Sequence, residues 1–152
     1  MTYIHPGFLA KLGRNEVFWA AFAAWVVAQT IKVAIGVVRE RRFNFKWFVG
    51  SGGMPSSHSA AVVGLATGIG IRYGVDSPFF TLALAFAFVT MFDAQGVRRQ
   101  SGKQAGALNR ILDDLYANRG IQMEPLKSLI GHTPFEVFAG AFVGVIVVML
   151  IL

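Results

Sequence analysis

The chain of 152 residues is 55% hydrophobic and only 14% charged, with a mean hydropathy of +0.56, which excludes an ordinary soluble domain and indicates an integral membrane protein. It has no cysteine, so disulfides, thiolate metal sites and cysteine nucleophiles are excluded. The net charge of +6 lies mainly in loops between apolar segments, which favours membrane lipids or a phosphate-bearing substrate over nucleic acid.

Four apolar segments follow a short N-terminal stretch that we expect to be frayed or to lie in the membrane interface. They are predicted to be membrane helices over residues 16–38, 60–73, 77–92 and 137–152. The second and third are short for a full span, so we expect them to tilt or to extend into the flanking loops. Gly64, Gly68 and Gly70 in the second segment indicate close helix packing.

Residues 104–118, before the last apolar segment, have the pattern of an amphipathic helix. Apolar side chains recur there at helical spacing, at Leu108, Ile111, Leu112 and Leu115. This pattern predicts a helix that lies in the membrane interface. The fold expected for residues 1–152 is therefore one all-α domain, a polytopic membrane helix bundle with about four spans plus an amphipathic interfacial helix.

Four spans would place the loops at 39–57 and 93–131 on the same side of the membrane. These loops carry ten of the fourteen Lys and Arg residues. The positive-inside rule then makes this side cytoplasmic and leaves both termini outside. We therefore expect a cytoplasmic active face, in the plasma membrane of a bacterium or in an organelle membrane.

The stretch Ser51–Ala60, Ser-Gly-Gly-Met-Pro-Ser-Ser-His-Ser-Ala, has the composition of an anion-binding loop that leads into a helix. Its glycines let the backbone approach a ligand, and Ser56 or Ser57 is a good N-cap. Amide groups at a helix start, with the positive end of the dipole, bind phosphate. His58 would lie beside such a phosphate and could protonate its leaving oxygen. The alternative is a glycine-rich cap of a membrane helix, with a histidine there by chance.

Lys32 is unusual because it lies within the first apolar helix. An intramembrane lysine is costly and is a functional candidate by default, whereas the alternative is that it snorkels to the nearby interface. Arg39 lies seven residues further on, on roughly the same helical face two turns away.

His132 and Glu136 open the last apolar segment and are four residues apart, so they share one helical face. A carboxylate in that place can hold an imidazole in one tautomer and raise its basicity, as a nucleophile or a base requires. The alternative is that Glu136 only caps its own helix near the positive end of the dipole.

Three motifs occur in order along the chain: Lys-x6-Arg, then Pro-Ser-Ser-His, then His-x3-Glu-x2-Ala-Gly. This order resembles the type 2 phosphatidic acid phosphatase superfamily, the membrane lipid phosphatases related to vanadium haloperoxidases. The stretches Ser51–Ala60, Asp93–Arg99 and Gly131–Val137 resemble the short divergent branch of that superfamily more closely. The resemblance covers roughly residues 32–144, the motif-bearing region.

The chain departs from the superfamily pattern at several positions. Glu40 replaces a proline of the first motif, Ser57 a glycine of the second, and Glu136 an aspartate of the third. The Ser-Arg pair of the third motif is absent, because Pro125 and Leu126 occupy its positions. That arginine normally clamps the phosphate.

Other cations could supply the missing charge of the clamp. Arg98, Arg99 and Lys127 are the candidates, and we prefer Arg98 and Arg99 because they follow Asp93 at a predicted membrane edge. The alternative for these two arginines is a collar that contacts lipid headgroups.

The resemblance implies a phosphohistidine mechanism without metal or cofactor. In it His132 attacks phosphorus, Glu136 orients the attacking ring, and His58 protonates the departing alcohol and then activates water. The implied phosphate-binding residues are Lys32, Arg39, Ser56, Ser57, Arg98 and Arg99.

The function expected from these features is a membrane-embedded phosphatase for a lipid-linked phosphate or pyrophosphate. The absent Ser-Arg pair favours an alternative, a catalytically silent protein that binds or transports phosphate or a lipid phosphate. A structural membrane subunit is a third alternative, but it leaves Lys32 unexplained. Because four spans are fewer than the six-helix core of the superfamily, a homodimer that completes the packing is a further hypothesis.

Overall fold

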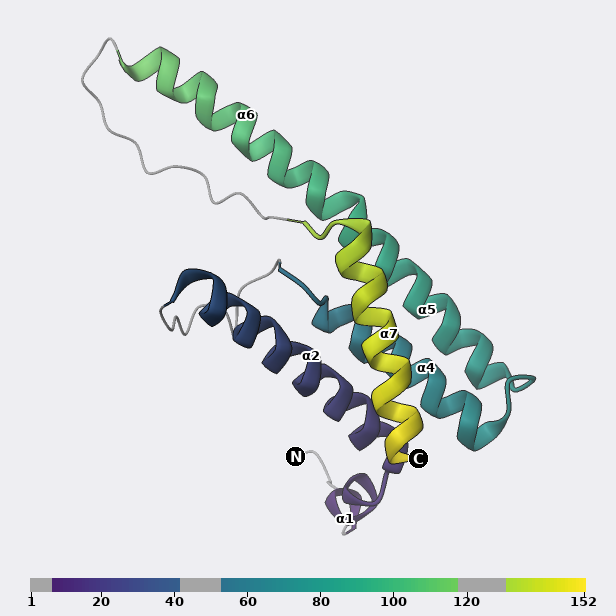
Figure 1. The fold of residues 1–152 in the computed structure, drawn as a ribbon. Coiled ribbons are helices and arrows are strands. Elements are labelled where there is room, and N and C mark those ends of the chain that lie inside the picture. The colour runs from purple at the N-terminus through teal and green to yellow at the C-terminus, as the bar shows by residue number, and fades with distance from the viewer. Residues whose placement is uncertain (1–6, 42–52, 118–130) are drawn as a thin grey trace.

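The structure is a computed structural model that describes residues 7–41, 53–117 and 131–152. All regular elements in these ranges are helices, which confirms the predicted all-α class. Figure 1 shows their arrangement. The helices are α1 (Phe8–Gly13), α2 (Glu16–Glu40), α4 (Ser57–Tyr73), α5 (Pro78–Gln95), α6 (Val97–Ala117) and α7 (Pro134–Ile151).

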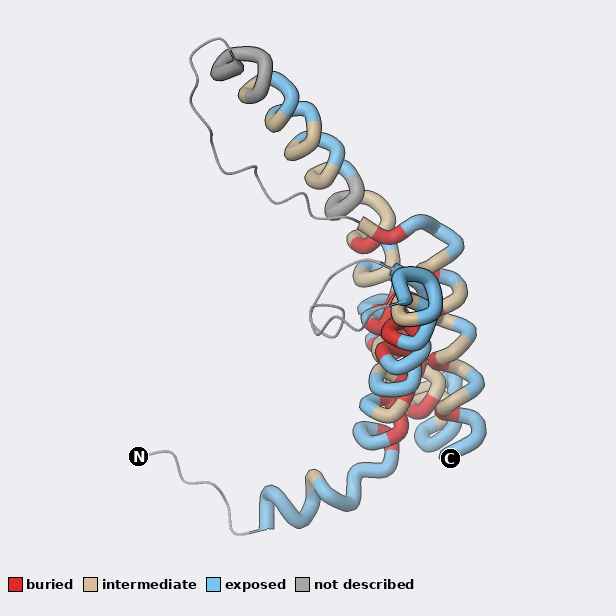
Figure 2. Tube along the Cα trace, turned by 60° about the vertical axis from the view of Figure 1, so that its left-hand side comes forward, coloured by how far each residue is buried: buried red, intermediate tan, exposed pale blue. Residues whose placement is uncertain are grey.

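Helices α2, α4, α5 and α7 form the bundle, and α4 lies at its centre in contact with the other three. Among the described residues, three stretches are long and apolar enough to cross a membrane: α2, residues 78–112 and α7. Helix α4 has 17 residues and shares its faces with three neighbours rather than with lipid. The buried residues follow this interior, as Figure 2 shows. The predicted membrane helix bundle is therefore confirmed.

Helices α4 and α7 run parallel and approach each other through glycines. A Cβ on Gly140 would overlap the backbone of Ser56, and one on Gly144 would overlap the backbone of Ala60. A Cβ on Gly64 would likewise crowd α7 and α2. Small residues allow helix backbones to pack closely in a membrane, where apolar surface alone does not drive association. The packing brings the N-termini of α4 and α7 side by side.

Side-chain caps fix where the bundle helices begin. The cap residues accept a hydrogen bond from a backbone N–H three residues later, and they are Asn15, Ser56, Ser77 and Thr133. The choice left open between Ser56 and Ser57 is thus settled in favour of Ser56. Helix α4 consequently begins at Ser57, three residues earlier than the apolar pattern predicted.

Two helical segments differ from the sequence-based prediction. Residues 8–13 form the short helix α1 rather than a frayed stretch, and a place in the membrane interface stays a prediction. Helix α6 begins at Val97 rather than at residue 104, so only Gly96 separates it from α5. The charged residues around Arg98 and Lys103 looked like a loop between apolar segments, but Gln, Arg and Lys are good helix formers and no proline interrupts them.

Helix α6 extends beyond the bundle and, among the described helices, contacts only α5 (Figures 1 and 2). The prediction of an amphipathic helix is confirmed for residues 104–117, whereas Asn118 lies outside the described ranges. Its placement in the membrane interface remains a prediction.

Candidate functional site

One end of the bundle gathers the segments that the motifs singled out. The C-terminal ends of α2 and α5 and the N-terminal ends of α4 and α7 all lie there (Figure 1). We call this the site end. His58 in the first turn of α4 and His132 just before α7 therefore lie at the same end of the bundle, as predicted for the two histidines. Which side of the membrane this end occupies remains a prediction.

The first turn of α4 is tied to α7 at the site end. Ser56 is fully buried, and its backbone N–H donates to the backbone oxygen of Glu136 over 3.0 Å. The Ser59 hydroxyl donates to Ser56 Oγ over 3.0 Å, and the Ser59 amide donates to the same atom over 3.4 Å. Ser57 is buried, whereas His58 in the same turn is exposed. Ser51 and Gly52 lie outside the described residues.

Glu136 holds His132 and caps α7 with the same oxygen. Its Oε2 lies 3.2 Å from His132 Nδ1 and accepts the Thr133 N–H over 2.9 Å. The Thr133 hydroxyl in turn accepts the Glu136 N–H over 3.4 Å, which completes a capping box. The sequence offered two interpretations of Glu136, as a partner of His132 and as a helix cap. They do not exclude each other, because the same carboxylate contacts the imidazole and caps α7.

His132 is fixed from both sides. Only 4% of its surface is exposed, and its backbone N–H donates to the Ala94 oxygen of α5 over 3.1 Å. When Nδ1 donates its proton to the carboxylate, the neutral ring has its lone pair on Nε2. The arrangement thus provides a buried imidazole whose second nitrogen is the basic one.

Lys32 is buried in the bundle rather than extended along its outer surface. Only 8% of it is exposed, and its stem lies against Gly53, where a Cβ would be 3.5 Å from Lys32 Cγ. Gly53 has φ +85°, a left-handed conformation that favours glycine. The Lys32 ammonium interacts electrostatically with Glu136. The structure therefore favours a place in the site over the snorkelling alternative.

Of the other predicted phosphate-binding cations, the structure describes only the side chain of Arg39, which lies outside this buried cluster. Arg39 is exposed near the C-terminal end of α2. Arg98 and Arg99 lie in the first turn of α6, and the structure does not describe their side chains. Pro125 and Leu126, which replace the Ser-Arg pair, lie outside the described residues, as does Lys127.

Sequence reasoning missed two features of the site. Gln29 is 3% exposed and precedes Lys32 by one helical turn on the buried face of α2. Thr133 forms the capping box, and its spacing to Glu136 at the start of an apolar run is a sequence signature that could have found it. A single buried amide in an apolar helix carries no comparable signature.

Two helix N-termini add partial positive charge to that of Lys32 at the site end. A helix N-terminus carries about half a positive charge, and the parallel packing sets two of them together. Their caps, Ser56 and Thr133, are linked through the Ser56–Glu136 backbone hydrogen bond. This arrangement suits a phosphate group better than a cation.

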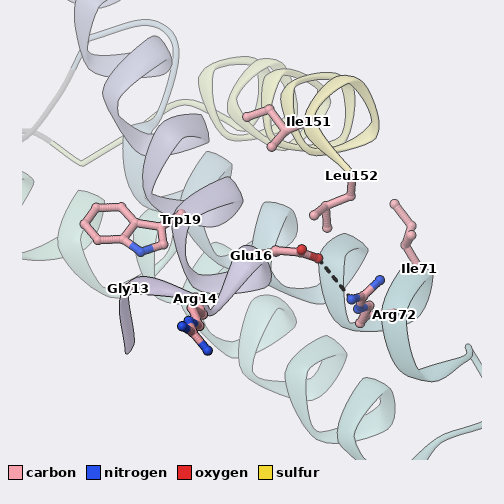
Figure 3. Close-up of a pocket in the computed structure, with 8 residues that line it drawn as sticks. All are labelled: Gly13, Arg14, Glu16, Trp19, Ile71, Arg72, Ile151 and Leu152. Carbon is pink, nitrogen blue, oxygen red and sulfur yellow. Dashed lines mark ion pairs between the residues drawn. The ribbon is translucent and has the colours of Figure 1, made fainter. Parts of the chain in front are cut away.

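A pocket of ≈ 860 Å³ lies at the opposite end of the bundle (Figure 3). It is lined by α2, α4 and α7 residues that include Trp19, Ile71 and Ile151. Arg72 and Glu16, which also line it, form an ion pair with 3.2 Å between Nη2 and Oε2, and their side chains are 61% and 59% exposed. Such an exposed pair is screened by solvent and contributes little to stability. No histidine lines this pocket within the described residues.

Replacing Arg72 by glutamine is expected to lower the free energy of unfolding by less than about 1 kcal/mol, because an exposed ion pair contributes little. Thermal unfolding in detergent of the variant and the wild type tests this. A large loss of stability in Arg72→Gln would instead show that this pair holds α2 against α4.

Within the described ranges, no three His, Asp or Glu side chains gather into a group that could bind a metal ion. The expectation that the chemistry needs no metal remains a prediction.

Comparison with known proteins agrees with the resemblance seen in the motifs. No solved structure matches the chain. It is 39% identical over 154 residues to the uncharacterized membrane protein YuiD of Bacillus subtilis strain 168, covering 93% of this chain and 96% of that protein. The family described as the Divergent PAP2 family matches residues 13–147. The chain therefore belongs to the Divergent PAP2 family.

Proposed function

We propose that this protein is a membrane-embedded phosphatase that hydrolyses a lipid phosphate or pyrophosphate through a phosphohistidine intermediate. One observation carries the proposal: Glu136 contacts His132 Nδ1 through its carboxylate and accepts the Ser56 N–H through its backbone oxygen. The candidate nucleophile and the candidate phosphate loop are thereby joined through a single residue.

In the first step, His132 Nε2 attacks phosphorus, and the N–P bond forms as the bond to the lipid oxygen breaks. Glu136 accepts the Nδ1 proton in a hydrogen bond and so stabilises the positive charge that develops on the ring. His58, exposed in the first turn of α4, donates its proton to the leaving lipid alcohol.

In the second step, a water molecule attacks the phosphohistidine and the N–P bond breaks. His58, now neutral, takes a proton from the water, and inorganic phosphate leaves. Each turnover therefore returns both histidines to their starting protonation states.

Negative charge on the transferring phosphoryl group needs preorganised positive partners. Lys32 is the buried cation of the cluster, and the N-termini of α4 and α7 add their dipoles. We assign Arg39, Arg98 and Arg99 to the approach of the anionic headgroup from the basic, cytoplasmic face. In this role they complement Lys32 and replace the superfamily's absent arginine.

The test is phosphate release by the purified protein in detergent against phosphatidic acid, phosphatidylglycerophosphate and polyprenyl pyrophosphate. Release from at least one of them, with acid-labile phosphate trapped on histidine, is expected. A folded protein that binds phosphate or vanadate but releases no phosphate from any substrate would contradict the proposal.

A second candidate function is a silent protein that binds or transports phosphate or a lipid phosphate. Pro125 and Leu126 in place of the Ser-Arg pair favour it. It predicts binding of inorganic phosphate without turnover, so the same assay separates the two candidates.

Replacing Glu136 by glutamine is expected to lower kcat by about 10²- to 10⁴-fold while the fold remains intact. The amide oxygen can still accept the Thr133 N–H, but it carries no charge to stabilise the His132 imidazolium. Initial rates together with thermal unfolding in detergent measure both effects.

Thr133→Ala is the matched control, because it removes the other half of the capping box without touching His132. It should lower the free energy of unfolding by about 1 kcal/mol and leave kcat nearly unchanged. Equal losses of kcat in Glu136→Gln and Thr133→Ala would indicate that Glu136 acts only as a helix cap.

A further inference from the structure

A groove of ≈ 570 Å³ lies between the C-terminal part of α5 and the first turns of α7. Its walls are mainly apolar and include three aromatic rings, Phe88 and Phe92 from α5 and Phe138 from α7. These rings are 65%, 77% and 63% exposed in the isolated chain. Both helices that form the groove belong to stretches long and apolar enough to cross a membrane, so exposed rings between them suit contact with hydrocarbon.

The polar end of the groove lies beside the candidate site. Asp93 and Gln95 line that end, and the oxygen of Ala94 between them accepts the backbone N–H of His132 over 3.1 Å. On the other wall, Phe138 lies near the start of α7. The groove therefore begins beside the segment of α5 that binds the His132 backbone.

The length of the groove matches part of one leaflet. Its lining on α5 runs from Phe88 to Gln95, which spans roughly 10 Å along the helix axis. Half of the hydrocarbon core measures about 15 Å. A lipid whose phosphate lay at His132 would thus place the upper part of its hydrocarbon chain along these aromatic rings.

The chemistry of the lining excludes the phosphate itself as the occupant. Asp93 is the charged residue among the described lining residues, and none of them is a cation. Aromatic side chains provide large, rigid apolar surfaces for van der Waals contact. Hydrocarbon fits this surface, while the phosphate fits the cationic cluster next to it.

We propose that this α5–α7 groove binds the hydrocarbon chain of the lipid whose phosphate lies at His132. The inference rests on the proposed function and adds how the protein selects its substrate: a long chain beside the phosphate improves binding through packing against Phe138 and Phe92. The substrate would enter sideways from the bilayer.

The test compares a long-chain phosphatidic acid with a short-chain, water-soluble one, which carry the same phosphate. In Phe138→Ala, KM and the dissociation constant for the long-chain lipid are expected to rise by about three- to tenfold. The effect is modest because the hydrocarbon chain of the lipid only exchanges contacts with bilayer lipid for contacts with the protein, and both are apolar. Values for the short-chain lipid should stay unchanged.

Val89→Trp provides a second variant that fills the groove instead of enlarging it, from an exposed position on α5. It should weaken long-chain binding by at least about tenfold, because a filled groove leaves no room for the chain. Phe142→Ala is the matched control: this ring is 67% exposed on α7 but lies outside the groove, so neither substrate should be affected.

The outcomes separate the groove from the catalysis. Loss of the long-chain preference in Phe138→Ala and Val89→Trp supports the groove, and equal effects on both substrates overturn it. If the wild type binds both lipids but releases no phosphate, the phosphatase proposal fails. The dissociation constants then still decide whether the groove selects the chain.

Discussion

Phosphate release is expected to fall by at least about 10⁴-fold when His132 is replaced by alanine, since the nucleophile of the proposed first step is then missing. The fold should persist, because the backbone N–H of residue 132 still donates to Ala94 and the capping box does not use the imidazole. Release from a lipid phosphate, thermal unfolding and vanadate binding of the variant measure these three properties. Unchanged turnover in His132→Ala would contradict the phosphohistidine mechanism.

His58→Ala is the comparison that separates nucleophile from general acid. Loss of His58 should slow the hydrolysis of a lipid phosphate by about 10²- to 10⁴-fold, because an alkoxide leaves poorly without a proton. A nitrophenyl phosphate has a leaving group that departs without a proton, so the first-turnover burst of nitrophenolate should be retained in His58→Ala and lost in His132→Ala, while later turnovers slow in His58→Ala because the second step also uses His58. Equal losses for both variants on both substrates would contradict the assigned roles.

The joint outcome also decides between turnover and binding alone. If wild type and His132→Ala bind vanadate equally and neither releases phosphate, the cluster of Lys32, Ser56 and Glu136 is a binding site that lacks turnover. The absent Ser-Arg pair would then explain the lack of catalytic activity, since Lys32 by itself would stabilise the charge on the transferring phosphoryl group too weakly.

Sequence patterns could predict the helices because their signals are local. Apolar runs, N-cap residues and the spacing of His132 and Glu136 act within one or two turns, and the structure has helices and a side-chain contact at those places. The same local logic failed at residues 97–103. Charge there suggested a loop, whereas helix propensity and the absence of proline favour the helix that forms.

Contacts between distant segments could not be predicted from the same patterns. The hydrogen bond between Ser56 and Glu136 joins positions 80 residues apart, and no local pattern in α4 or α7 identifies the partner. The buried side of α2 carries Gln29, which local composition gave no reason to select. Such pairings depend on how α2 and α7 pack against α4, a tertiary property.

The packing of α4 on α7 is expected to be the most sensitive structural feature of the site. In Gly140→Ala, the added methyl group would overlap the Ser56 backbone oxygen, which accepts the Ala60 N–H in the first turn of α4. Backbone cannot rotate away, so α4 must separate from α7 and the Ser56–Glu136 hydrogen bond is lost. We expect a loss of about 3 kcal/mol of stability, from overpacking and from the hydrogen bond together. Phosphate release should be lost with it.

Thermal unfolding in detergent measures this effect, with a decrease of roughly 10 °C expected for a chain of this size. Gly106→Ala on α6 is the matched control, because a Cβ there meets nothing within 4 Å and alanine favours a helix. That variant should unfold at the wild-type temperature or slightly above it. A Gly140→Ala protein with wild-type unfolding and phosphate release would show that the two helices can separate without disturbing the site. The contrast with Glu136→Gln is decisive, because that change should remove activity while the unfolding temperature stays the same.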